Sequence, residues 1–408
     1  MRRIESIRLG RSPNCSSLGN VVNVLVWTQA AVATLWVAAE AWEARRARRE
    51  PGGGATLRSD NPPALIRTRG EHGSSAGDGL ETGGPREAHV QVTRACSLPC
   101  PSCHIEPTAD GEHVSVTTLS ARFQTLSDAG VMHVAIGGGE SLRHPDLAGI
   151  ARAAHDAGLT IGMTTSGLGN LDDADVFEQV NVSLDGVGEG FQRARGYDGS
   201  GAALRAIRTL RQRADAGSGI RRVGINLVLD RATIESMEET VATAIEAGAR
   251  DVQLLRLKPV GRAAAHYDQR RLTPRQVMTV WPRIQAMIGS FPEVDFRVDC
   301  SMVPWLAAHG VDPKRMREFS ILGCHGGDDL VSVDVSGAVH PCSFVPEAVD
   351  VRWRDGVTAE PCASCSWRSL CRGGCHAVAR HVTGELFAAD PECPLVLRAR
   401  NDDAPATM

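Results

Sequence analysis

The 408-residue chain has almost no lysine and few aromatic residues. Of its 44 basic residues only Lys258 and Lys314 are lysines, and Phe, Trp and Tyr together make up 4%. The formal net charge is −4, so the sequence offers neither the basic excess nor the stacking aromatics that nucleic-acid binding requires. The histidines have no H-E-x-x-H or other paired spacing, which excludes a recognisable hydrolytic metal motif.

The chain contains an unusually large number of cysteines, and they are clustered. Three of the twelve cysteines lie within residues 96–103 and seven lie between residues 324 and 393. A chain of this length buries an ample core without disulfides, and clustered cysteines in a large chain are typical of metal ligation. Ligation needs reduced thiolates, so the pattern predicts a reducing, cytoplasmic compartment. Cys15 stands alone and receives no assigned partner.

The first 87 residues differ from the rest. Residues 1–49 form an N-terminal apolar segment with no charge from Ser12 to Ala39, followed by several arginines. About 20 apolar residues can cross a bilayer, but polar residues dilute this run. The alternatives are a membrane span, a signal peptide, and an amphipathic helix that contacts a membrane or the protein through residues 19–42. Residues 50–87 are rich in Gly, Pro, Ser and charge, which predicts a flexible linker.

From residue 88 onward, strand-like and helix-like patterns alternate. Strands are expected at His89–Thr93, His133–Ile136, Leu159–Thr164, Gln179–Leu184, Arg222–Leu229 and Asp251–Leu257. Helices are expected between them, for example at Thr117–Ala129, Ala202–Ala214 and Ile234–Ala247. This alternation predicts an α/β fold, a partial (β/α)6 TIM-like barrel over residues 88–265. A connecting region (266–323) and a small, loop-rich domain (324–400) follow. Chemistry in such barrels lies at the carboxyl ends of the strands.

The first cysteine cluster follows the first expected strand. Cys96, Cys100 and Cys103 have the spacing C-x3-C-x2-C. Three thiolates on a short loop can hold three irons of a cubane cluster and leave the fourth iron open for a substrate or cofactor. The alternatives are a zinc site that lacks one ligand and a set of buried structural cysteines. Zinc ligands usually come as two distant pairs, which this triplet does not resemble.

This motif resembles that of the radical S-adenosylmethionine (SAM) superfamily. The resemblance implies a [4Fe–4S] cluster whose open iron is chelated by the amino and carboxylate groups of SAM. It also implies that one electron from the cluster breaks SAM into methionine and a 5′-deoxyadenosyl radical, which abstracts hydrogen from a substrate. Ser102 stands where the family often has an aromatic residue.

Further motifs end the next expected strands. Gly138, Gly139 and Glu140 resemble the family's G-G-E motif, in which the carboxylate meets the SAM amino group. The resemblance implies that Ser166 and Ser183 contact the ribose or methionine and that Arg195 binds the SAM carboxylate. The alternative for each serine is an ordinary cap or turn residue. Asn226 and Lys258 are expected at the same mouth of the barrel.

The C-terminal cysteines resemble the SPASM extension of radical SAM enzymes, which carries two auxiliary [4Fe–4S] clusters and a Gly-x4-Cys element like Gly337 to Cys342. The resemblance assigns an outer cluster to Cys362, Cys365, Cys371 and Cys393, and an inner cluster to Cys324, Cys342 and Cys375. Our hypothesis is that Cys300 completes the inner cluster; the alternative is an inner cluster with an open iron. A zinc ribbon is the alternative for the whole region.

The resemblance therefore implies a peptide-modifying oxidoreductase with a radical SAM barrel and a SPASM domain. The expected substrate is a ribosomally made natural-product precursor, which would be crosslinked, epimerised or similarly modified. Expected partners are this peptide or protein, an electron donor such as flavodoxin or ferredoxin, and a separate leader-binding protein. The alternatives are a protein modification like that of anaerobic sulfatase maturases, a zinc-binding interaction module, and a thiol redox sensor.

Overall fold

The computed structural model describes residues 84–318, 321–347 and 356–402. The predicted apolar segment, with Cys15 and residues 19–42, lies outside the described residues, as does most of the predicted linker. Within the described ranges, none of the helices combines the length and apolar character that crossing a bilayer demands.

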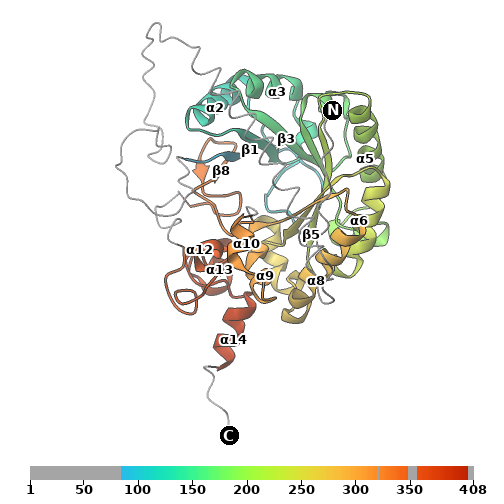
Figure 1. Ribbon diagram of the computed structural model, residues 1–408. Coiled ribbons are helices and arrows are strands. Elements are labelled where there is room, and N and C mark those ends of the chain that lie inside the picture. Colours follow the sequence, from blue (N-terminus) through green and yellow to red (C-terminus); the bar gives the residue numbers. More distant parts are fainter. Residues whose placement is uncertain (1–83, 319–320, 348–355, 403–408) are drawn as a thin grey trace, which may run out of the picture.

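One nine-stranded sheet forms the centre of the molecule, in the order β7-β6-β5-β4-β3-β2-β1-β8-β9. All neighbouring strands are parallel except β8 and β9, which are antiparallel. The sheet curves into an open barrel with helices on its outer face (Figure 1). The strands are β1 (Glu87–Thr93), β2 (His133–Gly138), β3 (Thr160–Thr165), β4 (Gln179–Ser183), β5 (Arg222–Leu229), β6 (Asp251–Arg256), β7 (Asp295–Val298), β8 (Leu330–Val333) and β9 (Val339–His340).

The predicted α/β fold with a parallel sheet is confirmed, and its six predicted strands lie within two residues of the observed bounds. The sheet nevertheless extends beyond six strands. β7 lies in the predicted connecting region, and β8 and β9 come from the predicted C-terminal domain. β7 pairs with β6 and β8 pairs with β1, and without them β6 and β1 would be open edges with unpaired backbone groups. The C-terminal third is therefore joined to the barrel by hydrogen-bonded strands.

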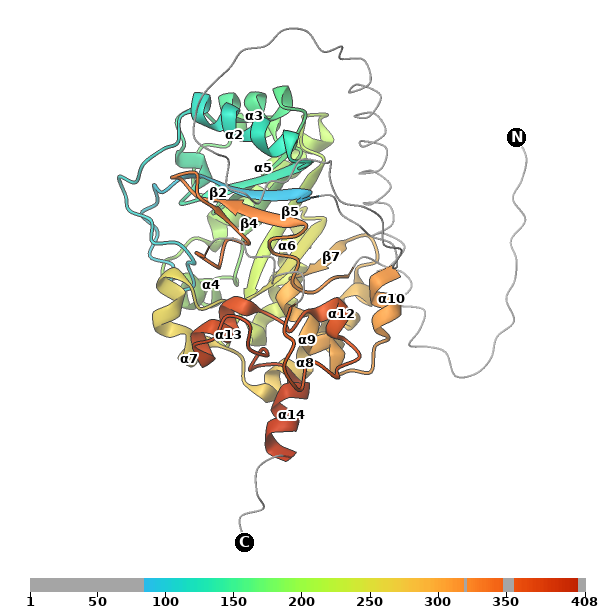
Figure 2. The ribbon, with the colours of Figure 1, turned by 90° about the vertical axis from the view of Figure 1, so that its left-hand side faces the viewer.

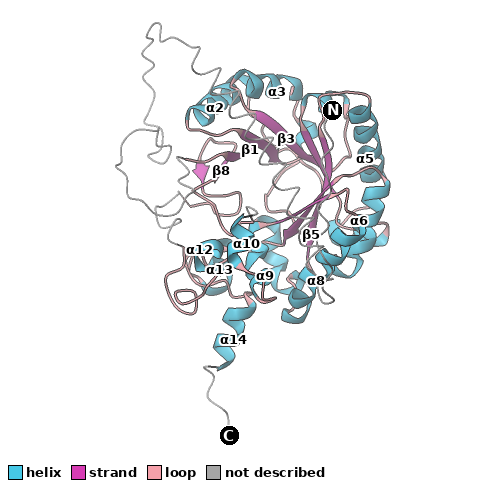
Figure 3. Ribbon diagram, viewed as in Figure 1, coloured by secondary structure: helices cyan, strands magenta, loops and turns pink. Residues whose placement is uncertain are grey.

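Helices alternate with the strands and cover the outer face of the sheet (Figure 3). The longest, α8, begins with a capping box in which the side chains of Thr273 and Gln276 each bond to the other's backbone N–H. The helices are α2 (Val116–Asp128), α3 (Leu147–Asp156), α4 (Glu189–Arg195), α5 (Ser200–Asp215), α6 (Met237–Glu246), α7 (Tyr267–Arg270), α8 (Pro274–Ser290), α9 (Val303–Ala307), α10 (Pro313–Glu318), α12 (Arg368–Cys371), α13 (His376–Thr383) and α14 (Pro394–Asp402).

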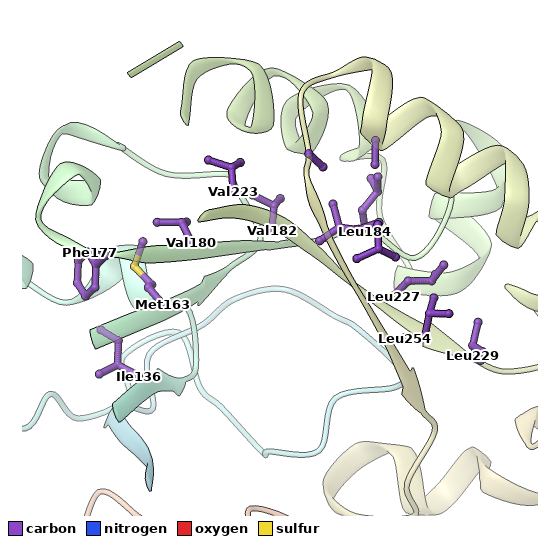
Figure 4. Close-up of a cluster of buried hydrophobic side chains, with 14 of the residues drawn as sticks. Ile136, Met163, Phe177, Val180, Val182, Leu184, Val223, Leu227, Leu229 and Leu254 are labelled. Atoms are coloured by element: carbon purple, nitrogen blue, oxygen red, sulfur yellow. The ribbon is translucent and has the colours of Figure 1, made fainter. Parts of the chain in front are cut away.

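The hydrophobic core lies between the sheet and this layer of helices. In β1, for example, Ala88, Val90 and Val92 are buried on the outer face, whereas Glu87, His89 and Gln91 alternate with them on the inner face and are only half-buried. Figure 4 shows the same core at β3, β4, β5 and β6, where Met163, Val182 and Leu254 are among the packed side chains. The outer face thus stabilises the barrel and leaves the inner face to polar residues.

The C-terminal elements gather at one end of the barrel. Helices α9, α12 and α13 lie close together, and α14 projects from them (Figure 2). A second apolar cluster lies here and includes Leu257, Tyr267, Val345 and Cys375. This cluster combines residues that follow β6 with residues from 324–400, so it packs the predicted C-terminal domain against the barrel.

Candidate functional site

The first cysteine loop leaves the carboxyl end of β1 and is held there by backbone hydrogen bonds. The N–H of Cys96 donates to the carbonyl of Thr108 at 2.8 Å, and the N–H of Cys103 donates to the carbonyl of Cys100 at 3.3 Å. Burial raises the pKa of the Cys100 thiol, and the nearby thiols of Cys103 and Cys96 raise it further, whereas Arg195 lowers it. The three sulfurs therefore share one small region in which a cationic group would stabilise their thiolates.

The two glycines of the G-G-E motif allow β2 to approach this loop closely. A Cβ atom at Gly138, whose φ is +120°, would lie 2.1 Å from the carbonyl oxygen of Thr93, and one at Gly139 would lie 2.4 Å from that of Ala95. The N–H groups of Gly139 and Glu140 donate to these two carbonyls at 2.8 and 2.9 Å. Glycine is therefore required at both positions for the motif to dock on the cysteine loop.

Glu140 is buried and already engaged by the chain. One carboxylate oxygen accepts hydrogen bonds from the Thr165 hydroxyl at 2.5 Å and the Leu142 N–H at 3.1 Å, and the other accepts from the Ser166 N–H at 2.8 Å. The carboxylate therefore ties the end of β2 to the end of β3. This structural role was not foreseen from the sequence, and the contact of Glu140 with the SAM amino group stays a prediction.

Ser166 and Ser183 lie at the carboxyl ends of neighbouring strands, as their motifs predict. Ser166 is buried just after β3, and its hydroxyl accepts a hydrogen bond from the N–H of Leu168 at 3.3 Å. Ser183 ends β4 and stands opposite Asn226 of β5 in the strand register. The turn bond of Ser166 agrees with the alternative reading of an ordinary turn residue, so its role toward SAM stays a prediction.

Arg195 lies beside the cysteine loop at the end of α4. Its guanidinium pairs with the buried carboxylate of Asp185 at 2.7 Å, and that carboxylate also accepts the N–H of Val228 at 2.8 Å. Its Nε is buried without a hydrogen-bond partner among the described residues. The neighbouring Gly196 faces the backbone of Pro99 in the cysteine loop. Arg195 is thus a cation fixed by Asp185, with its buried Nε–H unused, close to the thiol of Cys100.

An uncharged polar layer lines the inner face of the barrel nearby. The Asn181 amide donates to the side-chain oxygens of Asn226 at 2.8 Å and Gln253 at 3.3 Å, and the Asn226 amide donates to the Thr164 hydroxyl at 3.3 Å. These residues come from four adjacent strands, β3 to β6. The alternation of side chains within each strand could have indicated that these residues share one face. Of the four, only Asn226 was predicted from the sequence to lie at the mouth of the barrel.

A second set of cysteines, the inner group, consists of Cys300, Cys324, Cys342 and Cys375. Burial raises the pKa of Cys324 and of Cys342 to about 12. The thiol of Cys324 raises the pKa of both Cys342 and Cys300, and that of Cys375 raises all three. These mutual effects indicate that the thiol of Cys300 lies near those of the three cysteines from the C-terminal third. Cys300 begins the short helix Cys300–Met302, which follows β7.

A third set, the outer group, consists of Cys362, Cys365, Cys371 and Cys393. All four line one cavity, partly open to solvent, together with Trp367 and other apolar side chains. The pKa of Cys362 is raised to about 11, first by burial and then by the thiols of Cys393 and Cys365. The cavity therefore places four thiols around a common space.

The described cysteines are all free thiols, so no disulfide competes with ligation. Within the three described ranges, no three His, Cys, Asp or Glu side chains are set around a single point as the ligands of one metal ion are. The ligands of a cubane surround four irons, so they lie farther apart than those of one ion. Three thiols beside an arginine, and two sets of four thiols, fit the donor demand of one open and two fully ligated clusters.

Buried ion pairs join the barrel to the outer and inner groups, and no pattern in the sequence indicated them. Arg256 at the end of β6 forms two hydrogen bonds with Asp390, at 2.6 and 2.9 Å, and one with Glu392 at 3.0 Å. Asp390 also accepts the N–H of Cys375 at 2.9 Å. Asp390 and Glu392 lie 134 and 136 residues beyond Arg256 in the sequence. No local pattern can reveal pairs at such a separation.

Comparison with known proteins agrees with this geometry. Residues 90–244 match the model of the radical SAM superfamily. The chain is 26% identical over 341 residues to a PqqA peptide cyclase of Ruegeria pomeroyi, covering 74% of this chain and 86% of the relative. It is 25% identical over 350 residues to an AdoMet-dependent heme synthase of Methanosarcina barkeri, covering 76% and 97%.

A solved structure shares the fold. Streptococcus suis SuiB, in a crystal structure with its precursor peptide SuiA, has a TM-score of 0.59 at 16% sequence identity, and the similarity covers 76% of each chain. This similarity concerns the fold, and the match of residues 90–244 to the radical SAM superfamily confirms the resemblance inferred from the C-x3-C-x2-C motif.

Proposed function

We propose that this enzyme binds a [4Fe–4S] cluster through Cys96, Cys100 and Cys103 and uses SAM to modify a peptide, because residues 90–244 match the radical SAM superfamily. The observation that carries the proposal is the group of three thiols at the carboxyl end of β1, beside Arg195 and the docked glycines. When bound, the cluster supplies the electron that converts SAM into a hydrogen-abstracting radical.

The residues around this loop would bind and orient SAM. Gly138 and Gly139 expose backbone at the mouth of the barrel, and Glu140 offers a carboxylate to the SAM amino group beyond the hydrogen bonds it already accepts. Ser166 and Ser183 would donate hydroxyl hydrogen bonds to the ribose or methionine. Arg195 would direct its unused donor to the SAM carboxylate while Asp185 holds the guanidinium in place.

The role of Arg195 predicts a loss of SAM affinity on a conservative change. Arg195→Lys keeps a positive charge beside Asp185 but removes the planar fork, so the dissociation constant for SAM should rise about tenfold, the cost of one charged hydrogen bond. Equilibrium dialysis of SAM against the anaerobically reconstituted full chain measures it. Arg193→Lys is the matched control, since Arg193 lies on the same helix with a largely exposed side chain. Equal affinities for the two variants would contradict the assignment.

We further propose two auxiliary [4Fe–4S] clusters, in a domain over residues 324–400 that borrows Cys300. The outer group would hold one cluster through its four thiols, which share a cavity. The inner group would hold the other, and the mutual influence of Cys300, Cys324, Cys342 and Cys375 supports Cys300 as its fourth ligand. Four thiolates would ligate each cluster completely.

The assignment of Cys300 predicts a selective loss. Cys300→Ala should change or remove the spectrum of one cluster and lower the iron content by up to about four atoms per chain, as expected for one cubane. Iron analysis and Mössbauer spectroscopy measure this. Ser301→Ala is the control, because Ser301 is the next residue and its buried hydroxyl has no hydrogen-bond partner in the described structure. Unchanged cluster spectra in Cys300→Ala would favour an inner cluster with an open iron instead.

The proposed substrate is a ribosomally made precursor peptide. Similarity to a PqqA peptide cyclase, and to a structure that holds its precursor peptide, supports this class. A flavodoxin or ferredoxin would supply the electron, and a separate leader-binding protein would present the peptide.

The test is to incubate the reconstituted chain with SAM, a reductant and the peptide of a small reading frame adjacent to its gene. Formation of 5′-deoxyadenosine together with a mass change in the peptide supports the proposal. A brown, iron-containing chain that forms 5′-deoxyadenosine but acts only on a porphyrin would contradict the peptide substrate. A colourless, zinc-containing chain would indicate the interaction module instead.

A further inference from the structure

Lys258, one of the two lysines of the chain, is buried near the inner group. It lies two residues beyond β6, and only 7% of its surface is exposed. Its ammonium forms an ion pair with the buried carboxylate of Asp299 and lies 4.3 Å from the centre of the Phe344 ring. A buried ion pair is weak grounds for stability, since an apolar pair of similar volume often replaces one without loss. Its position therefore calls for another explanation.

The contacts of Lys258 place its charge among the inner-group cysteines. Asp299 immediately precedes Cys300, and Phe344 follows Cys342 by two residues. The ammonium lowers the pKa of Cys300, Cys342 and Cys375, while burial, the larger effect, raises each of them. Lys258 therefore acts on three of the four thiols.

Asp299 has the opposite effect on a partly different set of thiols. Its carboxylate raises the pKa of Cys300 and Cys324. It is fixed there by the N–H of Ser301, which donates to it at 3.0 Å. The pair thus places a negative charge next to Cys300 in the sequence and a positive charge over the ring of Phe344, two residues beyond Cys342.

Phe344 connects this pair with the first cysteine loop. The ammonium of Lys258 lies over its ring, and the centre of the ring lies 4.9 Å from the centre of the His104 ring. His104 follows Cys103 directly, and the N–H of Ala263 bonds to the carbonyl of Cys103 at 3.1 Å. Contacts between the side chains of His104, Phe344 and Lys258 therefore join the first loop to the Lys258–Asp299 pair.

We propose that Lys258 is a positioning charge that raises the reduction potential of the cluster held by the inner group, and that Asp299 opposes it. The inference rests on the proposed auxiliary cluster. Reduction adds an electron to a buried cluster that four thiolates already make negative. A fixed cation in this weakly screened interior stabilises the reduced form more than the oxidised form.

Two other cations near the inner group also pair with carboxylates. Arg256, whose charge also lowers the pKa of Cys375, binds the two carboxylates of Asp390 and Glu392. Arg372 lowers the pKa of Cys324 and pairs with Asp328 at 2.9 Å. Lys258 differs from Arg256 because it has a single carboxylate partner among the described residues. It differs from Arg372 because its side chain is 6% exposed rather than 25%, so solvent screens its charge less.

The test is a redox titration of the anaerobically reconstituted full chain, followed by electron paramagnetic resonance. The inner-cluster signal is the one that Cys342→Ala removes. Lys258→Met should shift its midpoint potential to a more negative value, and Asp299→Asn, which keeps the acceptor for Ser301, should shift it to a more positive value. Lys258→Arg should stay closer to wild type than Lys258→Met. Lys314→Met, the same change at the other, exposed lysine, should leave the potential unchanged.

Opposite shifts in the two variants support the inference, because a merely structural disturbance has no reason to follow the sign of the removed charge. Shifts of the same sign, or a Lys258→Met potential equal to that of Lys314→Met, overturn it while leaving the proposed cluster intact. A wild-type chain without any cluster signal that Cys342→Ala removes overturns the auxiliary-cluster proposal and this inference together. Iron content measured in parallel separates these two results.

Discussion

The variant in which Cys96, Cys100 and Cys103 are all replaced by alanine is expected to form no 5′-deoxyadenosine above the level of a protein-free control. Thiolates are the ligands that hold a cubane cluster, and no other cysteine lies between residues 16 and 299 to replace them. Iron should fall from about twelve to about eight atoms per chain, since each cubane contributes four. Chromatographic detection of 5′-deoxyadenosine and iron analysis measure the two effects.

A matched variant tests whether the loss belongs to this loop. Cys362→Ala and Cys365→Ala together remove two thiols from the outer group, whose cavity lies among C-terminal elements. That variant should lose about four irons as well, but it should still cleave SAM, because the first loop is intact. If the triple variant retained SAM cleavage, the assignment of the first cluster to these cysteines would be wrong. Equal loss in both variants would indicate a general failure of assembly.

Local signals in the sequence were sufficient for the barrel. The strand Arg222–Leu229 was predicted with its observed bounds, because an alternating apolar run there ends in turn residues on both sides. The helix predicted at Ile234–Ala247 is a short 3-10 turn, Ile234–Ser236, followed by α6. Spacing alone also located the first cysteine loop, since its three thiols lie within eight consecutive residues.

The sequence did not predict the strand pairs and ion pairs between residues far apart in the chain. β7 and β8 have four residues each, too short to show a period, and they were not expected to extend the barrel sheet. The partner of Lys258 is 41 residues away and that of Arg256 more than 130. Such pairs arise only when the chain folds back on itself, so composition and periodicity cannot indicate them. The hypothesis that Cys300 is a ligand came from the number of ligands that two clusters need. Only the folded structure shows which cysteines lie near it.

The second large effect concerns the ion pairs of Arg256. Arg256→Met should lower the free energy of unfolding by about 3–5 kcal/mol, the usual cost of leaving buried charges without their partner. Asp390 is fully buried and only 7% of Glu392 is exposed, so solvent cannot replace the lost guanidinium. Thermal unfolding of the anaerobically reconstituted chain, followed by circular dichroism, measures the loss.

The same variant should also loosen the cysteine groups. Asp390 accepts the N–H groups of Cys375 and Glu392, and its own carbonyl accepts that of Cys393 at 3.1 Å. A carboxylate that has lost its cation would move or take up a proton, and these bonds would weaken with it. Bleaching of the visible cluster absorbance should therefore begin at a lower temperature in Arg256→Met than in wild type.

Two further variants decide whether buried charge is the cause. Arg283→Met removes a comparable guanidinium whose partner, Glu238, is 45% exposed, so its loss should stay below about 1 kcal/mol. Adding Asp390→Asn to Arg256→Met removes the carboxylate that has lost its cation and should restore part of the stability, because the penalty comes from a buried charge left alone. Glu392 is kept, since it also pairs with Arg271. Equal losses in Arg256→Met and Arg283→Met, or no recovery in the double variant, would show that packing of the Arg256 side chain against Trp305 matters more than its charge.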